Sequence, residues 1–264
     1  MGRIHSTFSQ LRVKKQKALI PYLMAGDPSL EMTEALVLEI ERAGADIVEL
    51  GVPFSDPIAD GPVIQGAAQR SLKAGTSLNS IFQLVQTLRT RTQIPLVLMC
   101  YYNSILACGE KQFCSTAVEA GVDGIIIPDL PVEEGKSLRK MARMLGLDVI
   151  LLLAPTSTAE RIGKTVKDSK GFIYYVSLTG VTGAQLIHSR DIEEKVREIR
   201  HVSKLPVAVG FGISSPSEAA TVASFADGVI VGSALVKIIA EPTTHSAVLR
   251  RVSTFVHDLR QAVC

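Results

Sequence analysis

The sequence has no tryptophan, few aromatic residues (5% in total) and almost no excess of either charge, with a formal net charge of +2. Such a balance gives no field that would favour nucleic acid or an anionic membrane surface. The most apolar run, residues 149–155, is far shorter than the roughly 20 residues of a membrane-spanning helix, and no secretory signal is visible near the N-terminus. We therefore predict a soluble, cytoplasmic protein that binds neither nucleic acid nor membranes.

Cysteine is also sparse, and its spacing fits neither a disulfide framework nor a zinc site. The four cysteines are scattered at Cys100, Cys108, Cys114 and Cys264. We expect reduced thiols, which agrees with a cytosolic compartment.

Short apolar runs rich in β-branched residues recur along the chain and alternate with amphipathic segments. Runs this continuous are typical of parallel strands whose sheet is covered on both faces. Eight strands are predicted, at residues 18–24, 46–50, 95–100, 124–127, 148–153, 172–177, 206–209 and 228–231. Helices are predicted at residues 31–43, 77–90, 110–120, 133–145, 158–167, 191–202, 215–223 and 245–262.

Eight strand–helix units in uninterrupted alternation predict a closed (β/α)8 barrel, the TIM-barrel fold. We expect an additional N-terminal helix near residues 6–14 and small extra helices in the loops, one of them at residues 63–72. No linker-like stretch interrupts the pattern, so residues 1–264 are predicted to form a single domain. Two long connections, residues 51–77 and 178–189, follow strand ends at the face where such barrels build their active sites.

One short pattern recurs before three of the predicted strands. Its copies are Ala43-Gly44-Ala45-Asp46, Ala120-Gly121-Val122-Asp123 and Phe225-Ala226-Asp227-Gly228. In each copy a small residue ends a helix before the chain turns into a strand, and glycine suits a left-handed cap in the first two.

Glu49 is an acidic residue inside a strand-like apolar run. Side chains alternate along a strand, so Glu49 faces the barrel interior if Val48 and Leu50 pack on helices. A buried, unpaired carboxylate is costly unless it is hydrogen-bonded or protonated. The alternative is a structural ion pair, but the predicted strand interiors contain no Lys, Arg or His as a partner. The position therefore favours a functional acid.

Asp60 follows in a loop rich in proline, glycine and aspartate. A desolvated Glu49 and a loop-borne Asp60 would titrate apart and could divide acid and base roles between them. Asp-Gly is also a common turn signal, so a structural role stays open for Asp60 and for the nearby Asp56. Asp129, at the end of the fourth strand, is either a helix N-cap or a site residue.

Glycine-rich turns follow the seventh and eighth predicted strands. They are Val209-Gly210-Phe211-Gly212 and Val231-Gly232-Ser233-Ala234, the second directly before a short helix. Glycine lets backbone N–H groups approach an anion, and loops at these places in TIM barrels often hold a phosphate. Together with Gly183 in the sixth loop, the turns predict a phosphate site, with plain tight turns as the alternative.

The absence of certain residue types narrows the reaction class. A Schiff-base aldolase needs a lysine within a strand, and a metal-dependent epimerase needs histidines and carboxylates at strand ends. The predicted strands contain no lysine, and the histidines fall in helical, terminal or loop segments. We therefore expect a site without a metal and without imine chemistry.

The segment around Glu49 and Asp60 resembles the signature of one family. Residues 48–57 read Val-Glu-Leu-Gly-Val-Pro-Phe-Ser-Asp-Pro, and residues 59–62 read Ala-Asp-Gly-Pro. Supporting matches are Tyr101-Tyr102-Asn103, Pro128-Asp129-Leu130-Pro131, residues 177–183 and Gly210-Phe211-Gly212-Ile213. Over nearly its whole length the chain is similar to the tryptophan synthase alpha subunit family, which are indole-3-glycerol-phosphate lyases.

This resemblance implies a retro-aldol cleavage of indole-3-glycerol phosphate to indole and glyceraldehyde 3-phosphate. Glu49 would protonate the indole carbon that bears the side chain and manage the proton of the glycerol hydroxyl. Asp60 would accept a hydrogen bond from the indole N–H and stabilise the positive charge that builds there. Tyr174 would lie beside Glu49, and Thr182 would help to close the sixth loop over the second.

The same resemblance implies the remaining substrate contacts. The phosphate would bind at Gly183, Gly212, Gly232 and Ser233, and the indole ring would rest on Tyr22, Met99, Ile126 and Phe211. Simple core packing is the alternative for Phe211. Tyr22 departs from the phenylalanine expected at its position and adds a hydroxyl that needs a partner.

The resemblance further implies a partner. A β subunit carrying pyridoxal phosphate would dock at the strand C-terminal face in an α2β2 heterotetramer and receive indole directly. Asp56 and Asn103 would lie at or near this contact, and no cofactor is expected in the present chain. Three alternatives stay open: a stand-alone lyase that releases indole, a non-catalytic activator of the β subunit, and another phosphosugar barrel enzyme.

Overall fold

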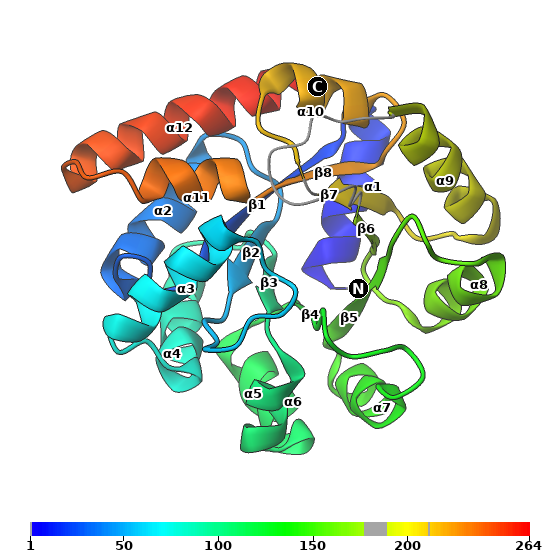
Figure 1. Ribbon diagram of the computed structural model, residues 1–264, viewed down its shortest axis with the longest axis horizontal. Coiled ribbons are helices and arrows are strands. Elements are labelled where there is room, and N and C mark those ends of the chain that lie inside the picture. Colours follow the sequence, from blue (N-terminus) through cyan, green and yellow to red (C-terminus); the bar gives the residue numbers. More distant parts are fainter. Residues whose placement is uncertain (1, 177–188, 211) are drawn as a thin grey trace.

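Eight parallel strands form a closed barrel in which each strand pairs with the next in sequence and β8 pairs with β1 (Figure 1). This computed structural model describes residues 2–176, 189–210 and 212–264. The strands are β1 (Ala18–Met24), β2 (Val48–Gly51), β3 (Leu96–Met99), β4 (Gly124–Ile126), β5 (Asp148–Leu153), β6 (Ile173–Val176), β7 (Val207–Gly210) and β8 (Gly228–Val231). The predicted (β/α)8 barrel is confirmed.

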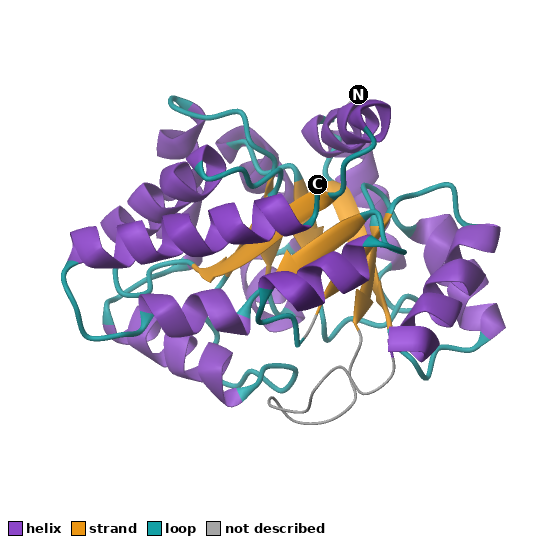
Figure 2. Ribbon diagram, turned by 90° about the horizontal axis from the view of Figure 1, so that it is seen from above, coloured by secondary structure: helices purple, strands orange, loops and turns teal. Residues whose placement is uncertain are grey.

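Helices form a ring around the strands (Figures 1 and 2). They are α1 (Arg3–Lys14), α2 (Leu30–Arg42), α3 (Pro62–Lys73), α4 (Leu78–Arg89), α5 (Tyr102–Cys108), α6 (Glu110–Ala120), α7 (Lys136–Leu145), α8 (Ala159–Asp168), α9 (Ser189–Val202), α10 (Pro216–Ala223), α11 (Ser233–Ile239) and α12 (His245–Ala262). Three of them, α3, α5 and α11, are additional helices inserted after β2, β3 and β8. Within the described residues, no helix combines the length and the apolar character needed to cross a membrane.

Helix α1 closes the end of the barrel at which the strands begin. Its buried residues Ile4, Phe8 and Leu11 pack with side chains of the barrel interior. The ring of Phe8 lies 5.7 Å from that of Phe172, the residue before β6. The N-terminal helix therefore fills the end of the barrel opposite to the loops that follow the strands.

Most predicted element boundaries agree with the structure to within two residues, and β1, β5 and β8 begin and end as predicted. The second strand begins at Val48 instead of Asp46. The side chain of Asp46 accepts the N–H of Leu19 at 2.8 Å. Helix α7 begins at Lys136 instead of residue 133, because the preceding segment turns back on the carbonyl of Pro131.

Helix α5 lies outside the predicted elements, and its N-terminus depends on another loop. The N–H of Tyr102 donates to Oδ1 of Asp129 at 2.9 Å, whereas α5 has no side-chain cap of its own. Asp129 therefore accepts the first N–H of α5 but is not itself a helix N-cap, since the N-cap of α5 is Tyr101 and that of α7 is Gly135; the N-cap interpretation is wrong in that form. The helix that it contacts precedes it in sequence, and α7, which follows it, begins without a side-chain cap.

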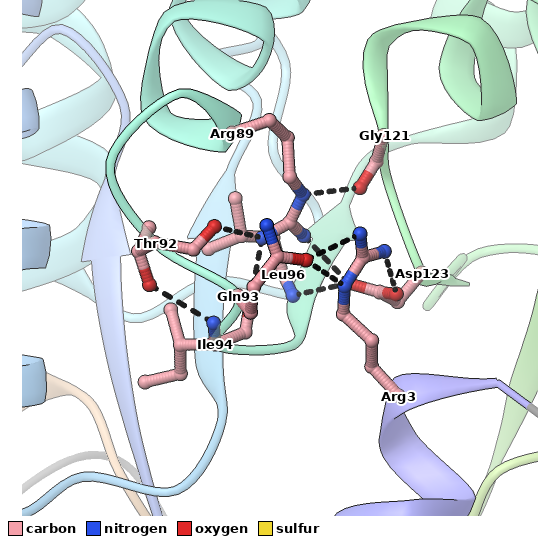
Figure 3. Close-up of polar contacts among 8 residues, drawn as sticks. All are labelled: Arg3, Arg89, Thr92, Gln93, Ile94, Leu96, Gly121 and Asp123. Atoms are coloured by element: carbon pink, nitrogen blue, oxygen red, sulfur yellow. Dashed lines mark hydrogen bonds and ion pairs between the residues drawn. The ribbon is translucent and has the colours of Figure 1, made fainter.

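The pattern repeated before β2, β4 and β8 marks a carboxylate that joins two strands to a helix. In the middle copy, Oδ2 of Asp123 accepts the N–H of Leu96 in β3 at 2.9 Å and Nη2 of Arg89 in α4 at 2.6 Å (Figure 3). Arg3 of α1 reaches the other carboxylate oxygen at 3.0 Å. Gly121 leaves room for the arginine, since a β-carbon there would lie 2.7 Å from Cγ of Arg89.

The other two copies make corresponding contacts. Asp46 accepts an N–H of β1 at 2.8 Å and Nη1 of Arg260 in α12 at 2.7 Å. Asp227 accepts the first N–H of β7 at 3.0 Å and pairs with Arg200 of α9. The spacing of the pattern is thus explained by the aspartate, which satisfies a strand donor and an arginine together.

Between β5 and β6, two residues divide this role. Oγ of Ser169 accepts the N–H of Leu151 in β5 at 3.2 Å. Arg139 of α7 binds the neighbouring Asp168 at 2.8 Å. The strand pairs β1–β2, β3–β4 and β7–β8 are therefore each fastened, at the end where the strands begin, to an arginine of a helix.

We expect Asp123→Ala to lower the free energy of unfolding by about 3–5 kcal/mol, because it leaves Arg89 largely buried without its charge partner. The side chains of Arg89 and Asp123 are only 11% and 7% exposed. Urea unfolding followed by circular dichroism measures the effect. As a control, Arg91→Ala removes a pair with Glu34 in which the arginine is 56% exposed, and it should cost less than about 1 kcal/mol. Equal losses in the two variants would contradict this role of Asp123.

Candidate active site

Glu49 faces the interior of the barrel from β2. Its neighbours Val48 and Leu50 pack in the apolar layer between strands and helices, whereas Ile47 belongs to the interior cluster, so alternation directs Glu49 inward. The residue is 1% exposed, and within the described residues neither carboxylate oxygen has a hydrogen-bond partner. A structural ion pair, the alternative interpretation of Glu49, is therefore absent from the described part of the chain.

Burial raises the pKa of Glu49 to about 8, and the negative charge of Asp60 adds to the effect. Removal from water penalises the charged carboxylate and favours the neutral acid. At neutral pH, Glu49 is consequently protonated and able to donate a proton.

Asp60 lies directly before α3, at the end of the loop that leaves β2. Its backbone carbonyl accepts Nε2 of Gln65, in the first turn of α3, at 2.8 Å. Burial raises the pKa of the Asp60 side chain to about 6, and a hydrogen bond from the Tyr101 hydroxyl opposes the rise. Asp60 is therefore mostly ionised at neutral pH, while Glu49 is mostly protonated. The two acids titrate apart in the order expected for a desolvated strand residue and a loop residue.

Tyr101 holds the loop that carries Asp60. Its hydroxyl accepts the N–H of Ala59 at 3.0 Å, and its ring stacks on Phe54 with centroids 5.1 Å apart and an angle of 25°. Tyr101 belongs to one of the sequence motifs, but the sequence did not predict it as a site residue. The signal that could have found it is its place directly after the end of β3, at the face where the acids lie.

Two buried tyrosines share the mouth of the barrel with the two acids. Burial raises the pKa of Tyr22 well above its ordinary value, and the charges of Asp60 and Glu49 raise it further. Burial also raises the pKa of Tyr174, followed by the charges of Glu49 and then Asp60. The structure thus brings together Tyr22, Glu49, Asp60 and Tyr174, four of the residues selected from the sequence.

Glycines at two strand ends make room for these tyrosines. A β-carbon on Gly51 would lie 2.0 Å from the hydroxyl oxygen of Tyr22, and one on Gly210 would lie 2.6 Å from that of Tyr174. Contacts of 2.0 and 2.6 Å to a β-carbon are far inside van der Waals distance. The extra hydroxyl of Tyr22 therefore lies over the bare backbone at the end of β2.

Apolar side chains complete the part of the mouth that the structure describes. Ile126 of β4 is fully buried in the interior cluster together with Tyr174. Met99 of β3 is partly buried between this cluster and a second one that contains Tyr22. The residues Thr182, Gly183 and Phe211 lie outside the described residues, so the predictions for them stay predictions.

The glycine-rich turns after β7 and β8 lie on neighbouring strands of the barrel. Gly212 has a φ of +82°, a conformation that side-chain-bearing residues rarely adopt. Gly232 is the N-cap of α11, and Ser233 is its first residue. Backbone N–H groups at this helix start are not used by intrahelical bonds and are available to an acceptor.

The two residues expected at a partner contact are both exposed. Asp56 lies in the loop after β2, and Asn103 lies in α5 after β3. Two large apolar side chains are exposed beside them, Ile58 at 85% and Leu106 at 56%. Ile58 lies in the segment that follows β2, and Leu106 lies in α5, which follows β3.

The described residues contain no group of three or more histidine, cysteine, aspartate or glutamate side chains that could hold a metal ion. The polar groups that converge at the described mouth are two carboxyl groups and three tyrosine hydroxyls. This set can donate, accept and orient protons, and its chemistry is that of an acid–base site.

The high pKa of Glu49 predicts a pH-dependent stability. A folded-state pKa of about 8 lies above the ordinary 4.5, so the contribution of Glu49 is present at low pH and is lost as the pH rises through 8. Glu49→Gln should therefore be more stable than the parent protein by a few kcal/mol at about pH 8.5, and this advantage should shrink toward about pH 5.5. Urea unfolding of both proteins across this range tests it. A difference that does not change with pH would contradict the burial of an unpaired acid.

Comparison with known proteins agrees with this geometry. Residues 8–264 match the family model described as tryptophan synthase alpha chain. The chain is 51% identical over 263 residues to the tryptophan synthase alpha chain of Geobacter sulfurreducens, covering 100% of this chain and 99% of that protein. The alpha chain of Thermoanaerobacter sp. is 45% identical, with 100% of both proteins covered.

Solved structures give the same result. Tryptophan synthase subunit alpha from Legionella pneumophila superimposes with a TM-score of 0.92 at 39% identity, covering 100% of this chain and 98% of that one. A chain of tryptophan synthase from M. tuberculosis, in an aminoacrylate-bound form, superimposes with a TM-score of 0.89 at 34% identity and 100% coverage of both chains. The chain therefore belongs to the tryptophan synthase alpha chain family, the lyases that cleave indole-3-glycerol phosphate in tryptophan biosynthesis.

Proposed function

We propose that Glu49 and Asp60 are the catalytic residues with which this chain cleaves indole-3-glycerol phosphate to indole and glyceraldehyde 3-phosphate. The observation that carries the proposal is the orphaned carboxyl of Glu49, with its pKa of about 8, next to the lower pKa of Asp60, about 6. At neutral pH the pair supplies one proton donor and one negative charge. These are the two groups that a retro-aldol cleavage of this substrate requires.

Glu49 moves the proton in both halves of the reaction. It first donates its proton to the indole carbon that bears the glycerol side chain, which places a positive charge on the ring nitrogen. The resulting carboxylate then removes the proton of the adjacent hydroxyl while the carbon–carbon bond breaks. The bonding electrons return to the indole ring, the aldehyde leaves, and Glu49 regains its proton. The cleavage is therefore balanced in protons and electrons without a further acid, base or redox partner.

Asp60 stabilises the intermediate. Its carboxylate accepts a hydrogen bond from the indole N–H, where the positive charge develops after protonation of the ring. A fixed negative charge in a partly buried site is more effective than the same charge in water, because the surroundings do not have to reorganise. The hydrogen bond from Tyr101, which lowers the pKa of Asp60, favours the ionised form that this role needs.

The remaining predicted residues bind the rest of the substrate. The indole ring is proposed to rest between Tyr22, Met99, Ile126 and Phe211, with Tyr174 beside Glu49. The phosphate group is proposed to lie on the backbone N–H groups of Gly183, Gly212, Gly232 and Ser233, with Thr182 closing the sixth loop. The positive end of α11 and the positive φ of Gly212, which a glycine adopts readily, support this assignment for the phosphate.

Glu49→Gln should reduce the turnover of indole-3-glycerol phosphate by at least about 10³-fold, because the amide has nearly the same shape but cannot shuttle a proton. Asp60→Asn should reduce it by about 10–100-fold, since the hydrogen bond is kept but the negative charge is lost. Indole release measured with and without added β subunit reports the effect. Circular dichroism of both variants serves as the control for folding. A turnover close to that of the parent protein would remove the altered residue from the mechanism.

We also propose that the chain functions in the cytoplasm as part of a complex. The related M. tuberculosis structure is named tryptophan synthase, and its form is aminoacrylate-bound. A β subunit carrying pyridoxal phosphate is proposed to dock at the strand C-terminal ends, in an α2β2 assembly, and to accept indole. Asp56, Asn103 and the exposed apolar residues Ile58 and Leu106 support a contact at this end. The retention of a costly buried acid speaks against a chain that only activates its partner.

Leu106→Glu should weaken the binding of the β subunit by at least about tenfold, because it places a charge in the apolar part of the proposed contact. Isothermal titration calorimetry of the two subunits measures the affinity. The matched control is Met144→Glu, which changes an apolar residue of α7 that is 73% exposed and should leave the affinity unchanged. Equal affinities of the Leu106 and Met144 variants would exclude α5 from the interface.

A further inference from the structure

Helix α3 joins the proposed catalytic Asp60 to two other parts of the mouth. It begins two residues after Asp60, and its buried face includes Ile64, Ala67 and Ala68. These side chains pack in one cluster with Tyr22 and Met24 of β1 and with Val236 of α11. The position of α3 therefore determines where Asp60 lies relative to β1.

A bidentate ion pair fastens this helix to the loop after β1. Nε and Nη2 of Arg70 donate to the two carboxylate oxygens of Asp27 at 2.8 and 2.7 Å. The side chain of Asp27 is 3% exposed and that of Arg70 is 41% exposed. A two-point contact between planar groups fixes orientation as well as distance, which a single charge contact does not.

The backbone next to Asp27 is held against the same helix. Oγ of Ser71 in α3 donates to the carbonyl of Ala25 at 2.6 Å. Gly26 has a φ of +81°, and a β-carbon there would lie 2.7 Å from Oγ of Ser71. The chain after β1 and the last turns of α3 are thus in direct contact on both sides of the ion pair.

We propose that the Asp27–Arg70 ion pair is a positioning device for catalysis, which sets the place of Asp60 by fixing α3 on β1. The proposal rests on the catalytic role assigned to Asp60 above. Arg70 and Asp27 do not themselves touch the reacting atoms. They act through α3, whose first turn holds the carbonyl of Asp60 through Gln65.

The geometry predicts that the pair matters more for turnover than for substrate binding. Helix α11, which begins at the proposed phosphate residues, packs on β1 and α12 as well as on α3, so it keeps two supports when the pair is broken. Asp60 has α3 as its neighbour on one side and a loop on the other. A displacement of a catalytic group by about 1 Å can lower a rate by about 10²-fold.

The test compares Arg70→Met with a matched control at the other end of the barrel. Arg200 also pairs with an aspartate through Nε and Nη2, and its side chain is 40% exposed. We expect Arg70→Met to lower kcat by about 10–100-fold with a change in KM of less than about threefold. Arg200→Met should lower the melting temperature to a comparable extent and leave kcat unchanged. An equal loss of kcat in both variants, or no loss in either, would overturn the proposal.

Two further measurements separate positioning from a general loss of stability. Arg70→Lys keeps the charge but not the two-point contact, so it should restore only part of kcat, and Asp27→Asn should resemble Arg70→Met while changing little in shape. Arg70→Met should also lower kcat much less in an Asp60→Asn background than in the parent protein, because the group that it positions is already impaired. Full additivity of the two substitutions would contradict action through Asp60.

The same experiment distinguishes this proposal from the proposed catalytic role. If Asp60→Asn alone retains the parent kcat, the assignment of Asp60 is wrong. If Asp60→Asn is impaired as expected but Arg70→Met is not, the catalytic role holds and the positioning role is excluded.

Discussion

A carboxyl group enclosed in an apolar barrel, without a hydrogen-bond partner among the described residues, is the constraint on which the proposed chemistry of this protein depends. An isolated charge in such surroundings is costly, and the protein avoids it by keeping the proton on Glu49. The surroundings thus turn an ordinary carboxylate into an acid that is available at neutral pH. A cation placed next to it would remove the cost and the proton donor together. The eight described strands contain no basic side chain, and this absence is what allows Glu49 to keep its proton.

The two ends of the barrel use charge in opposite ways. Where the strands begin, Asp46, Asp123 and Asp227 each satisfy a strand N–H and an arginine at once, so their charges are compensated and fasten strands to helices. Where the strands finish, Glu49 has no compensating partner among the described residues, which fits its proposed role as the acid. A buried carboxyl that destabilises the fold can be tolerated because the other end carries repeated compensated contacts. The Asp27–Arg70 pair is a compensated contact at the reactive end, where it orders a helix and leaves the acid unpaired.

The barrel, the direction of Glu49 and the contrast between the two acids could be predicted because they depend on local sequence. The alternation of side chains along β2 predicts the direction of Glu49. The composition of the loop around Asp60 predicts that the two acids have different surroundings. The partners of Asp46, Asp123 and Asp129 could not be predicted, because they come from elements far away along the chain. Arg260 is 214 positions from Asp46, and no local pattern identifies it. The role of Tyr101 was missed for the same reason, since it follows from contacts with another loop. Predictions for Thr182 and Gly183, and for a single domain, stay predictions.

On the proposed assignment, the two acids also influence one another during the reaction. The negative charge of Asp60 is one of the causes that raise the pKa of Glu49, so the group that will stabilise the cation also helps to keep the acid protonated beforehand. When positive charge develops on the indole nitrogen, it offsets the charge of Asp60 and reduces that effect. Glu49 then releases its proton more easily at the stage at which the ring is accepting it. This coupling acts only if Asp60 is ionised first. The hydrogen bond from Tyr101, which opposes the rise in the pKa of Asp60, therefore supports the proton transfer made by Glu49 without contacting that proton.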